Sequence, residues 1–339
     1  MSPPTPLPTL FITGALGYIG GTILTVLKRS QPSILVRALV RDDTQASLLS
    51  TFYGHTVTPI IGDLSDLQML KEEAAKADIV IQATGDNREA VLALMEGTTL
   101  NPKHTSQIVK EKPIFMQISG ASNVGHTKLG ENSPRVWSDV HDWDDILGLE
   151  ETRISVGTDN AIRKFAGEMD VRSLIVSPPT ILGRGLGAGR KETHQRTMYD
   201  LIVKNGAAVL GGEGTNAWST VSIEDLGRAC VFLLEEGMKG HESRLKFGKN
   251  GYYFVEAFEL AVADRVKACA ERLYREGRIP TPNVSTKTIE EFQRELGFFE
   301  SYLFCSSSRV KADKLRGLGW KPLDLDWLRM VQEAPGYRC

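Results

Sequence analysis

The sequence predicts an α/β protein built on a parallel β-sheet that is wound in two halves. Short apolar runs alternate with helical segments through the first half of the chain, which is typical of parallel strands joined by right-handed crossover helices. The first run, Leu10–Ile12, leads into a glycine-rich turn, Gly14–Gly20, and apolar residues at helical spacing follow. With 339 residues, 41% of them hydrophobic, the chain can form one large domain with a lobe, or two domains.

The same alternation gives each later element. After the first strand, we expect strands at 33–40, Val57–Ile61, Asp78–Gln82, Pro113–Ile118 and Val171–Val176. Helices are expected at Thr44–Phe52, Leu67–Ala77, Asn87–Met95, Thr158–Ala166, His194–Val203 and Leu226–Glu236. Beyond Gly185 the alternation loosens, and we expect a short strand at Tyr252–Val255 with helices at 256–275 and 288–296.

Composition excludes several classes of protein. The formal net charge of −2 gives no support for a nucleic-acid or membrane surface, and no apolar run is long enough to span a bilayer. Residues 1–9 lack the basic and apolar regions of a secretory signal, so we expect a flexible tail. The four cysteines lie far apart without paired spacing, from which we expect reduced thiols, a cytoplasmic protein and no metal site.

The glycine turn predicts a dinucleotide site. A buried strand, a glycine turn and a helix N-terminus place backbone N–H groups and the helix dipole against a diphosphate. The alternative is a tight turn with a structural role only. The residues expected to contact the cofactor here are Thr13, Gly14, Gly17, Tyr18, Ile19 and Gly20.

The end of the second strand indicates which dinucleotide binds. An acidic side chain about twenty residues after the last glycine would bind the ribose hydroxyls, whereas Arg41 supplies a forked cation suited to a 2′-phosphate. This favours NADP(H) over NAD(H). Arg37 is a second candidate, and a solvated arginine beside two aspartates is the alternative.

Residues after the third and fourth strands complete the expected cofactor site. Asp63, followed by Leu64, is placed to accept a hydrogen bond from the adenine amino group, although it could equally cap the next helix. The small residues Ala83, Thr84 and Gly85 would let the backbone lie close to the ribose and diphosphate.

Seven motifs in order resemble one superfamily. They are TGALGYIGG at 13–21, VRALVRD at 36–42, GDL at 62–64, ATG at 83–85, ISGAS at 118–122, SPPTILGRG at 177–185 and STVSIEDLGRA at 219–229. Together they resemble the extended and atypical short-chain dehydrogenase/reductases, including the NmrA-like and nucleoside-diphosphate-sugar-epimerase-like branches.

The resemblance implies a Rossmann-type doubly wound parallel sheet, bound NADP(H) and a smaller C-terminal lobe that closes on the substrate. It also implies that the run after the sixth strand, with Pro178, Pro179 and Thr180, lines the nicotinamide. We therefore expect a cofactor domain at 10–180 plus about 219–236, and a substrate lobe at 181–218 and 237–339.

One family feature is missing from this sequence. The family carries a Tyr-x-x-x-Lys pair in which the lysine lowers the tyrosine pKa, but none of the eight tyrosines here has a lysine four residues on. Other groups must then supply the proton. The candidates are Ser119 and Ser122 after the fifth strand, Asp159 and the lobe residue Tyr199.

Each candidate has a structural alternative. Ser119 could cap a helix, and Thr158 is a candidate N-cap that would leave Asp159 in the first turn, facing the helix dipole. The substrate candidates are Trp137, His194 and Trp218, and their structural alternative is packing, since lobe aromatics often only fill a core.

Three functions compete. The first is an NADP(H)-dependent oxidoreductase acting on a small apolar molecule (an imine, conjugated alkene or carbonyl) in specialised metabolism, with an isomerisation or cyclisation as a variant. The second is an NmrA-like regulator that senses NADP without turnover. The third, a sugar-nucleotide epimerase or dehydratase, is disfavoured by the missing tyrosine. We expect a monomer or homodimer whose partner is a small molecule.

Overall fold

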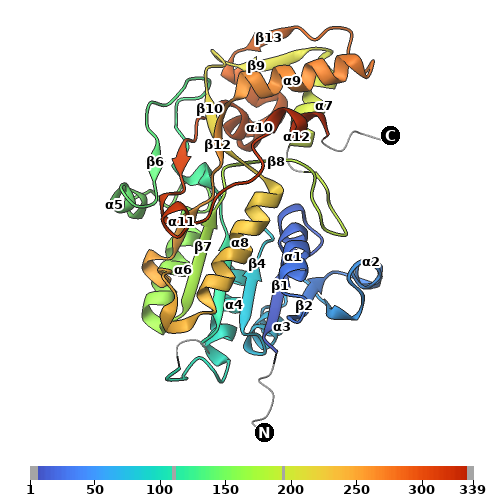
Figure 1. The fold of residues 1–339 in the computed structure, drawn as a ribbon. Helices are drawn as coiled ribbons and strands as arrows, with labels where there is room; N and C mark the ends of the chain where they lie inside the picture. The colour runs from blue at the N-terminus through green and yellow to red at the C-terminus, as the bar shows by residue number, and fades with distance from the viewer. Residues whose placement is uncertain (1–6, 109–111, 193–194, 334–339) are drawn as a thin grey trace.

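The computed structural model describes residues 7–108, 112–192 and 195–333. Its largest element is a seven-stranded parallel sheet with the strand order β11-β7-β5-β4-β1-β2-β3 (Figure 1). The strands are β1 Thr9–Thr13, β2 Leu35–Val40, β3 Val57–Ile61, β4 Ile79–Gln82, β5 Ile114–Ile118, β7 Arg172–Ser177 and β11 Tyr252–Phe254. The doubly wound α/β sheet predicted from the sequence is therefore confirmed.

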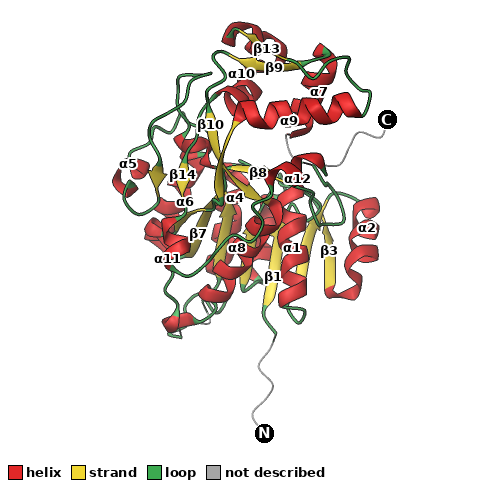
Figure 2. Cartoon of the chain, turned by 45° about the horizontal axis from the view of Figure 1, so that its top comes forward, coloured by secondary structure: helices red, strands yellow, loops and turns green. Residues whose placement is uncertain are grey.

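Helices cover both faces of the sheet. Helices α1 and α8 pack together on one face, with α4 and α6 on the other (Figure 2), and α3 packs against α4. Their bounds are α1 Tyr18–Ser30, α2 Asp43–Tyr53, α3 Leu67–Ala75, α4 Arg88–Leu100, α6 Val156–Met169 and α8 Ile223–Gly237. Strand order reverses between β1 and β4, so the carboxyl ends of these strands flank the crevice where α/β sheets bind ligands.

A second group of elements forms the lobe at the top of Figure 1. It contains a three-stranded sheet, β12-β10-β8, a two-stranded sheet, β13-β9, and a separate apolar core. Its strands are β8 Thr180–Leu182, β9 Ala208–Gly211, β10 Ala217–Ser222, β12 Phe258–Ala261 and β13 Val284–Lys287. Its helices are α7 Gln195–Asn205, α9 Val262–Arg275, α10 Ile289–Cys305 and α12 Trp327–Gln332.

Two features differ from the sequence expectations. The helix expected at 256–275 begins only at Val262, as α9. The residues before it, Phe258–Ala261, form β12, which pairs antiparallel with β10. Strand β11, within the range expected for the lobe, instead pairs with β7 at the edge of the main sheet. In both cases a partner strand far away in the sequence determines the outcome.

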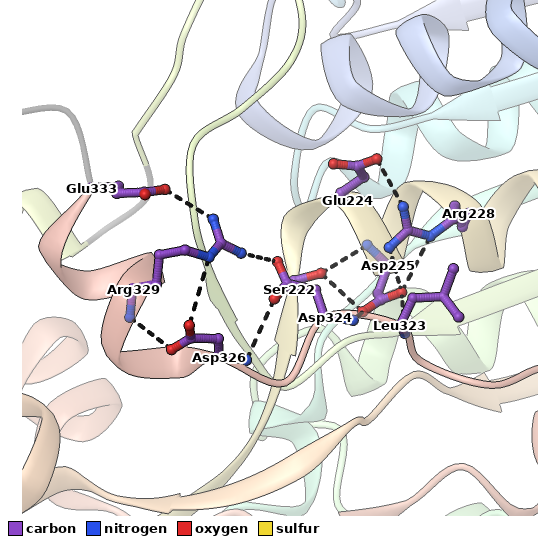
Figure 3. A network of polar contacts seen from close by, with 9 residues as sticks. All are labelled: Ser222, Glu224, Asp225, Arg228, Leu323, Asp324, Asp326, Arg329 and Glu333. Carbon is purple, nitrogen blue, oxygen red and sulfur yellow. Dashed lines mark hydrogen bonds and ion pairs between the residues drawn. The ribbon is translucent and has the colours of Figure 1, made fainter.

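Short elements connect the two parts. They are the two-stranded sheet of β6 Trp137–Ser138 and β14 Val310–Lys311, with helices α5 Trp143–Leu147 and α11 Asp313–Gly317. A second connection joins α8 to the C-terminal segment through the carboxylate of Asp225, which accepts backbone N–H bonds from Leu323 and Asp324 (Figure 3). This segment continues into α12, which packs against α9 of the lobe.

Candidate functional site

The glycine turn leaves the N-terminus of helix α1 without a side-chain cap. Gly14 has a φ of +74°, a conformation that favours glycine, and its carbonyl accepts the Gly17 N–H at 2.8 Å. A Cβ atom on Gly20 would collide with the same carbonyl. Gly17 precedes α1 without a side-chain cap, and the first turn of α1 contains no acidic residue. The N–H groups at the start of α1 are therefore available for a diphosphate.

The end of β4 lies beside this turn. A Cβ atom on Gly14 would come within 2.6 Å of the Ala83 carbonyl oxygen. The Gln82 amide donates to the Thr84 hydroxyl at 2.8 Å and to the Gly85 carbonyl at 3.1 Å, which fixes the backbone of this segment. Between the two turns, the Thr13 hydroxyl is buried without a hydrogen-bond partner in the described structure. A close-packed backbone and an unpartnered hydroxyl fit a dinucleotide at this edge.

The two arginines proposed for the 2′-phosphate differ in their surroundings. Arg37 is committed to an ion pair with Glu73 at 2.5 Å, so it is not free to bind a phosphate. Arg41 is exposed, and its neighbour Asp42 is occupied as the N-cap of α2, accepting from the Gln45 N–H at 2.8 Å. Of the two, Arg41 is the cation open to a ligand.

Asp63 does not cap the following helix, so the capping role expected for it beside adenine binding is wrong. Asp66 caps α3, while Asp63 accepts from both the hydroxyl and the backbone N–H of Ser65. The Ser65 hydroxyl holds the pKa of Asp63 below its usual range. Leu64, next to it, packs half-buried against the main core.

Ser119 lies at the carboxyl end of β5 against a buried carboxyl group. Its hydroxyl bonds to Asp159 Oδ2 on α6 at 2.9 Å, and the Asn123 amide donates to the same oxygen at 2.8 Å. Asp159 is 1% exposed, and its Oδ1 atom has no hydrogen-bond partner in the described structure. The sequence predicted Ser119 and Asp159 as separate candidates, and the fold brings them together.

Burial raises the pKa of Asp159 to about 7. The Arg163 guanidinium, one turn further along α6, acts in the opposite direction, and the Asp86 carboxylate from the segment after β4 raises the pKa further. Arg163 also lies over the ring of Tyr252 on β11, whose hydroxyl donates to Ser177 at 2.9 Å. Asp159 is therefore an acid that changes its protonation near neutral pH.

The start of α6 differs from the sequence expectation. Thr158, expected as the N-cap, lies inside the helix, and its hydroxyl bonds instead to Asp86. Ser155 precedes the helix in the left-handed region, with a φ of 58°. Asn123, Arg163 and Tyr252 were not predicted as site residues. No local pattern singles them out, because they come from the turn after β5, from α6 and from β11, which are far apart in the sequence.

The remaining candidates lie elsewhere. Tyr199 is buried in the lobe and donates to the Val331 carbonyl at 2.8 Å, while Trp218 is buried and donates to the Ser306 carbonyl at 2.7 Å. Trp137 lies on β6 with the Arg135 guanidinium 3.5 Å above its ring. These contacts give all three a place in packing. His194 lies outside the described residues.

Two further segments border Ser119. Ser122 follows it in the same short turn, and its carbonyl accepts the Tyr302 hydroxyl of α10 at 2.9 Å. The Pro178 carbonyl accepts the Ala121 N–H at 2.9 Å, so the segment from Pro178 to Thr180 lies beside the Ser119 turn. Among the described residues, no cluster of His, Cys, Asp or Glu could hold a metal ion, and no helix could cross a membrane.

Comparisons with known proteins agree with this geometry. Residues 8–100 match the model of the NmrA-like family, which confirms the resemblance drawn from the motifs. The oxidase ucsJ of Acremonium sp. is 28% identical over 328 residues, covering 93% of this chain and 92% of that protein.

Solved structures show the same fold. DesIV, a dTDP-glucose 4,6-dehydratase from Streptomyces venezuelae with NAD and TYD bound, superposes with a TM-score of 0.65 at 16% identity, covering 96% of each chain. Vestitone reductase from alfalfa superposes with a TM-score of 0.60 at 16% identity, also covering 96% of each chain. The chain therefore shares the α/β fold of this dehydratase and this reductase.

Proposed function

We propose that the protein is an NADP(H)-dependent oxidoreductase that acts on a small, largely apolar organic molecule in specialised metabolism. The observation that carries the proposal is the Ser119–Asp159 pair at the end of β5, two strands from the glycine turn. This arrangement supports a proton-donating role for the Ser119 hydroxyl beside the proposed dinucleotide site. A carbonyl compound, conjugated alkene or imine could react there.

The cofactor would be held along the carboxyl edge of the sheet. The diphosphate would lie on the uncapped N-terminus of α1, and Arg41 would bind the 2′-phosphate. The segment Pro178–Thr180 would border the nicotinamide. NADPH, when bound, supplies the hydride that reduces the substrate.

Ser119 and Asp159 would supply the proton. When a carbonyl carbon gains the hydride, its oxygen takes the proton of the Ser119 hydroxyl, and Ser119 regains one from the Asp159 carboxyl group. Asp159 ends as a carboxylate and is reprotonated from solvent. A ketone, NADPH and one proton thus give an alcohol and NADP⁺. Asp159 acts through Ser119 and is a positioning residue, whereas Ser119 touches the reacting oxygen.

Ser119→Ala, Asp159→Asn and the double variant test this proposal. NADPH consumption would be followed with acetophenone, cyclohexenone and 3,4-dihydroisoquinoline as probes. With the ketone, each single variant should lower kcat about 100-fold at unchanged NADPH affinity. The double variant should lose no more than either single variant, since the two groups act in series.

A readout without turnover accompanies this test. The infrared carbonyl band of protonated Asp159 identifies its titration by comparison with Asp159→Asn. The hydrogen bond from Ser119 stabilises the Asp159 carboxylate and so lowers the pKa of Asp159. Ser119→Ala removes this bond and should raise that pKa. An unchanged titration would contradict the shared proton, and multiplicative losses of kcat would show that the two residues act separately.

A regulator that binds NADP without turnover is the second candidate. The NmrA-like model matches residues 8–100, which lie almost entirely within the first part of the expected cofactor domain. Tight NADPH binding with no consumption of any probe would favour this function over catalysis.

A further inference from the structure

A glycine-rich and basic segment crosses the start of α1. We call residues 183–191, with the sequence GRGLGAGRK, the basic strap. It belongs to the chain between β8 and α7, which descends beside α1 in Figure 1. Three hydrogen bonds attach it: Tyr18 Oη to the Gly183 carbonyl at 2.8 Å, the Leu186 N–H to Thr22 Oγ1 at 3.1 Å, and the Arg190 N–H to the Leu16 carbonyl at 2.9 Å.

Two glycines allow the basic strap to lie this close. A Cβ atom on Gly187 would come within 2.6 Å of the Gly21 Cα atom of α1. A Cβ atom on Gly189 would collide with the Leu16 carbonyl of the glycine turn. The backbone of the basic strap is thus fitted directly against the turn that would hold the diphosphate.

Within residues 7–108, 112–192 and 195–333, the cations of the basic strap have no acidic partners. No hydrogen bond or ion pair of the described residues involves the side chains of Arg184, Arg190 or Lys191. The Glu192 carboxylate accepts from the Lys191 backbone N–H and not from its ammonium group. That ammonium lies 5.5 Å from the ring centre of Phe52 on α2, the helix that follows Arg41. Positive charges therefore gather on the adenosine side of the glycine turn.

The pKa of Lys191 is lowered, as expected for an ammonium group without a negative charge beside it. Partial burial lowers its pKa, and the nearby charge of Arg184 lowers it further. An anion between these cations would reverse the second effect. The distribution of charge thus indicates an anionic ligand.

We propose that the basic strap is the outer wall of the dinucleotide site and that Arg190 and Lys191 bind phosphate oxygens of the cofactor. This inference rests on the proposed function. The phosphate group is either the diphosphate, present in both nucleotides, or the 2′-phosphate, present only in NADP(H). Both share the chemistry that guanidinium and ammonium groups recognise.

The test measures NADPH and NADH dissociation constants by nucleotide fluorescence for the wild-type chain and for Arg190→Gln with Lys191→Gln. Arg275→Gln, which removes an exposed cation from the lobe helix α9, is the matched control. The double variant should bind NADPH about 100-fold more weakly, about tenfold for each contact, while the control binds normally. Equal loss for NADH identifies the diphosphate, and loss for NADPH alone identifies the 2′-phosphate.

A second variant changes the fit without changing charge. Gly187→Ala should push the basic strap away from Gly21 and weaken NADPH binding at least tenfold. Wild-type affinity in both Gly187→Ala and the double variant would overturn the inference. Failure of the wild-type chain to bind either nucleotide would instead overturn the proposed function, so the two failures are distinguishable.

Discussion

Two buried aspartates in the same domain have opposite surroundings. Asp225 on α8 is 0% exposed and Asp159 on α6 is 1% exposed. Both oxygens of Asp225 are occupied: Oδ1 accepts from Arg228 and the Leu323 N–H, and Oδ2 accepts from Ser222 and the Asp324 N–H (Figure 3). Asp159 has neutral partners on one oxygen and, in the described structure, none on the other.

The difference shows what each carboxyl group does. Backbone N–H groups and a guanidinium stabilise a buried carboxylate, so Asp225 joins α8 to the C-terminal segment. Asp159 is too poorly partnered to stay ionised at low energetic cost, which makes it a poor structural anchor and a suitable proton source. The predictions below test this contrast between an anchoring and an acidic aspartate.

The largest expected effect is on folding stability at Asp225. Asp225→Ala removes the acceptor of five hydrogen bonds and should lower the free energy of unfolding by about 4 kcal/mol, measured by urea denaturation. Glu224→Ala, which loses only a half-exposed pair with Arg228, should cost less than about 1 kcal/mol. A similar small loss for both variants would show that the Asp225 cluster is not an anchor.

The second effect is the pH dependence of stability at Asp159. Its folded pKa of about 7 lies above the unfolded value of 3.8, so the folded state binds the additional proton between these values. The contribution of Asp159 to stability should therefore be fully present below about pH 4 and be lost as the pH rises to about 7. Because other groups titrate too, the measurement is the difference between wild type and Asp159→Asn across this range. If this difference in stability stays constant across the range, Asp159 does not gain or lose a proton there and cannot be the proton source.

A third prediction concerns a second pair of like residues, Arg41 and Arg37. Arg41→Ala should weaken NADPH binding about tenfold, about 1.4 kcal/mol, and leave NADH binding unchanged. Arg37→Ala should leave nucleotide preference unchanged, because Arg37 is already paired with Glu73. If Arg37→Ala alone alters the preference, the roles of the two arginines are reversed.

The smallest effect is expected at Tyr199. Its hydroxyl bonds to the Val331 carbonyl inside the lobe, so Tyr199→Phe should cost about 1 kcal/mol of unfolding free energy. Thermal unfolding compared with the exposed-position variant Tyr274→Phe provides the control. No loss of stability would mean that this hydroxyl is as loosely partnered as the Asp159 carboxyl group.

Local sequence patterns predicted the elements that are determined by residues close together in the sequence. The glycine turn and Val57–Ile61, which matches β3 residue for residue, follow from short-range pattern alone. Strand β12 was missed because its pairing with β10 crosses some forty residues. Asp159 was assigned to a helix start, but its pairing with Ser119 depends on how α6 packs beside β5, which no sequence window contains.

The attachment of Leu323 and Asp324 to Asp225 has a consequence for biosynthesis. Helix α8 is made almost a hundred residues before the backbone groups that complete its carboxylate cluster. Until Leu323 and Asp324 have been made, water must take the place of their N–H groups at the Asp225 carboxylate. A chain cut off shortly before Leu323 would lack two of the hydrogen-bond donors that hold Asp225.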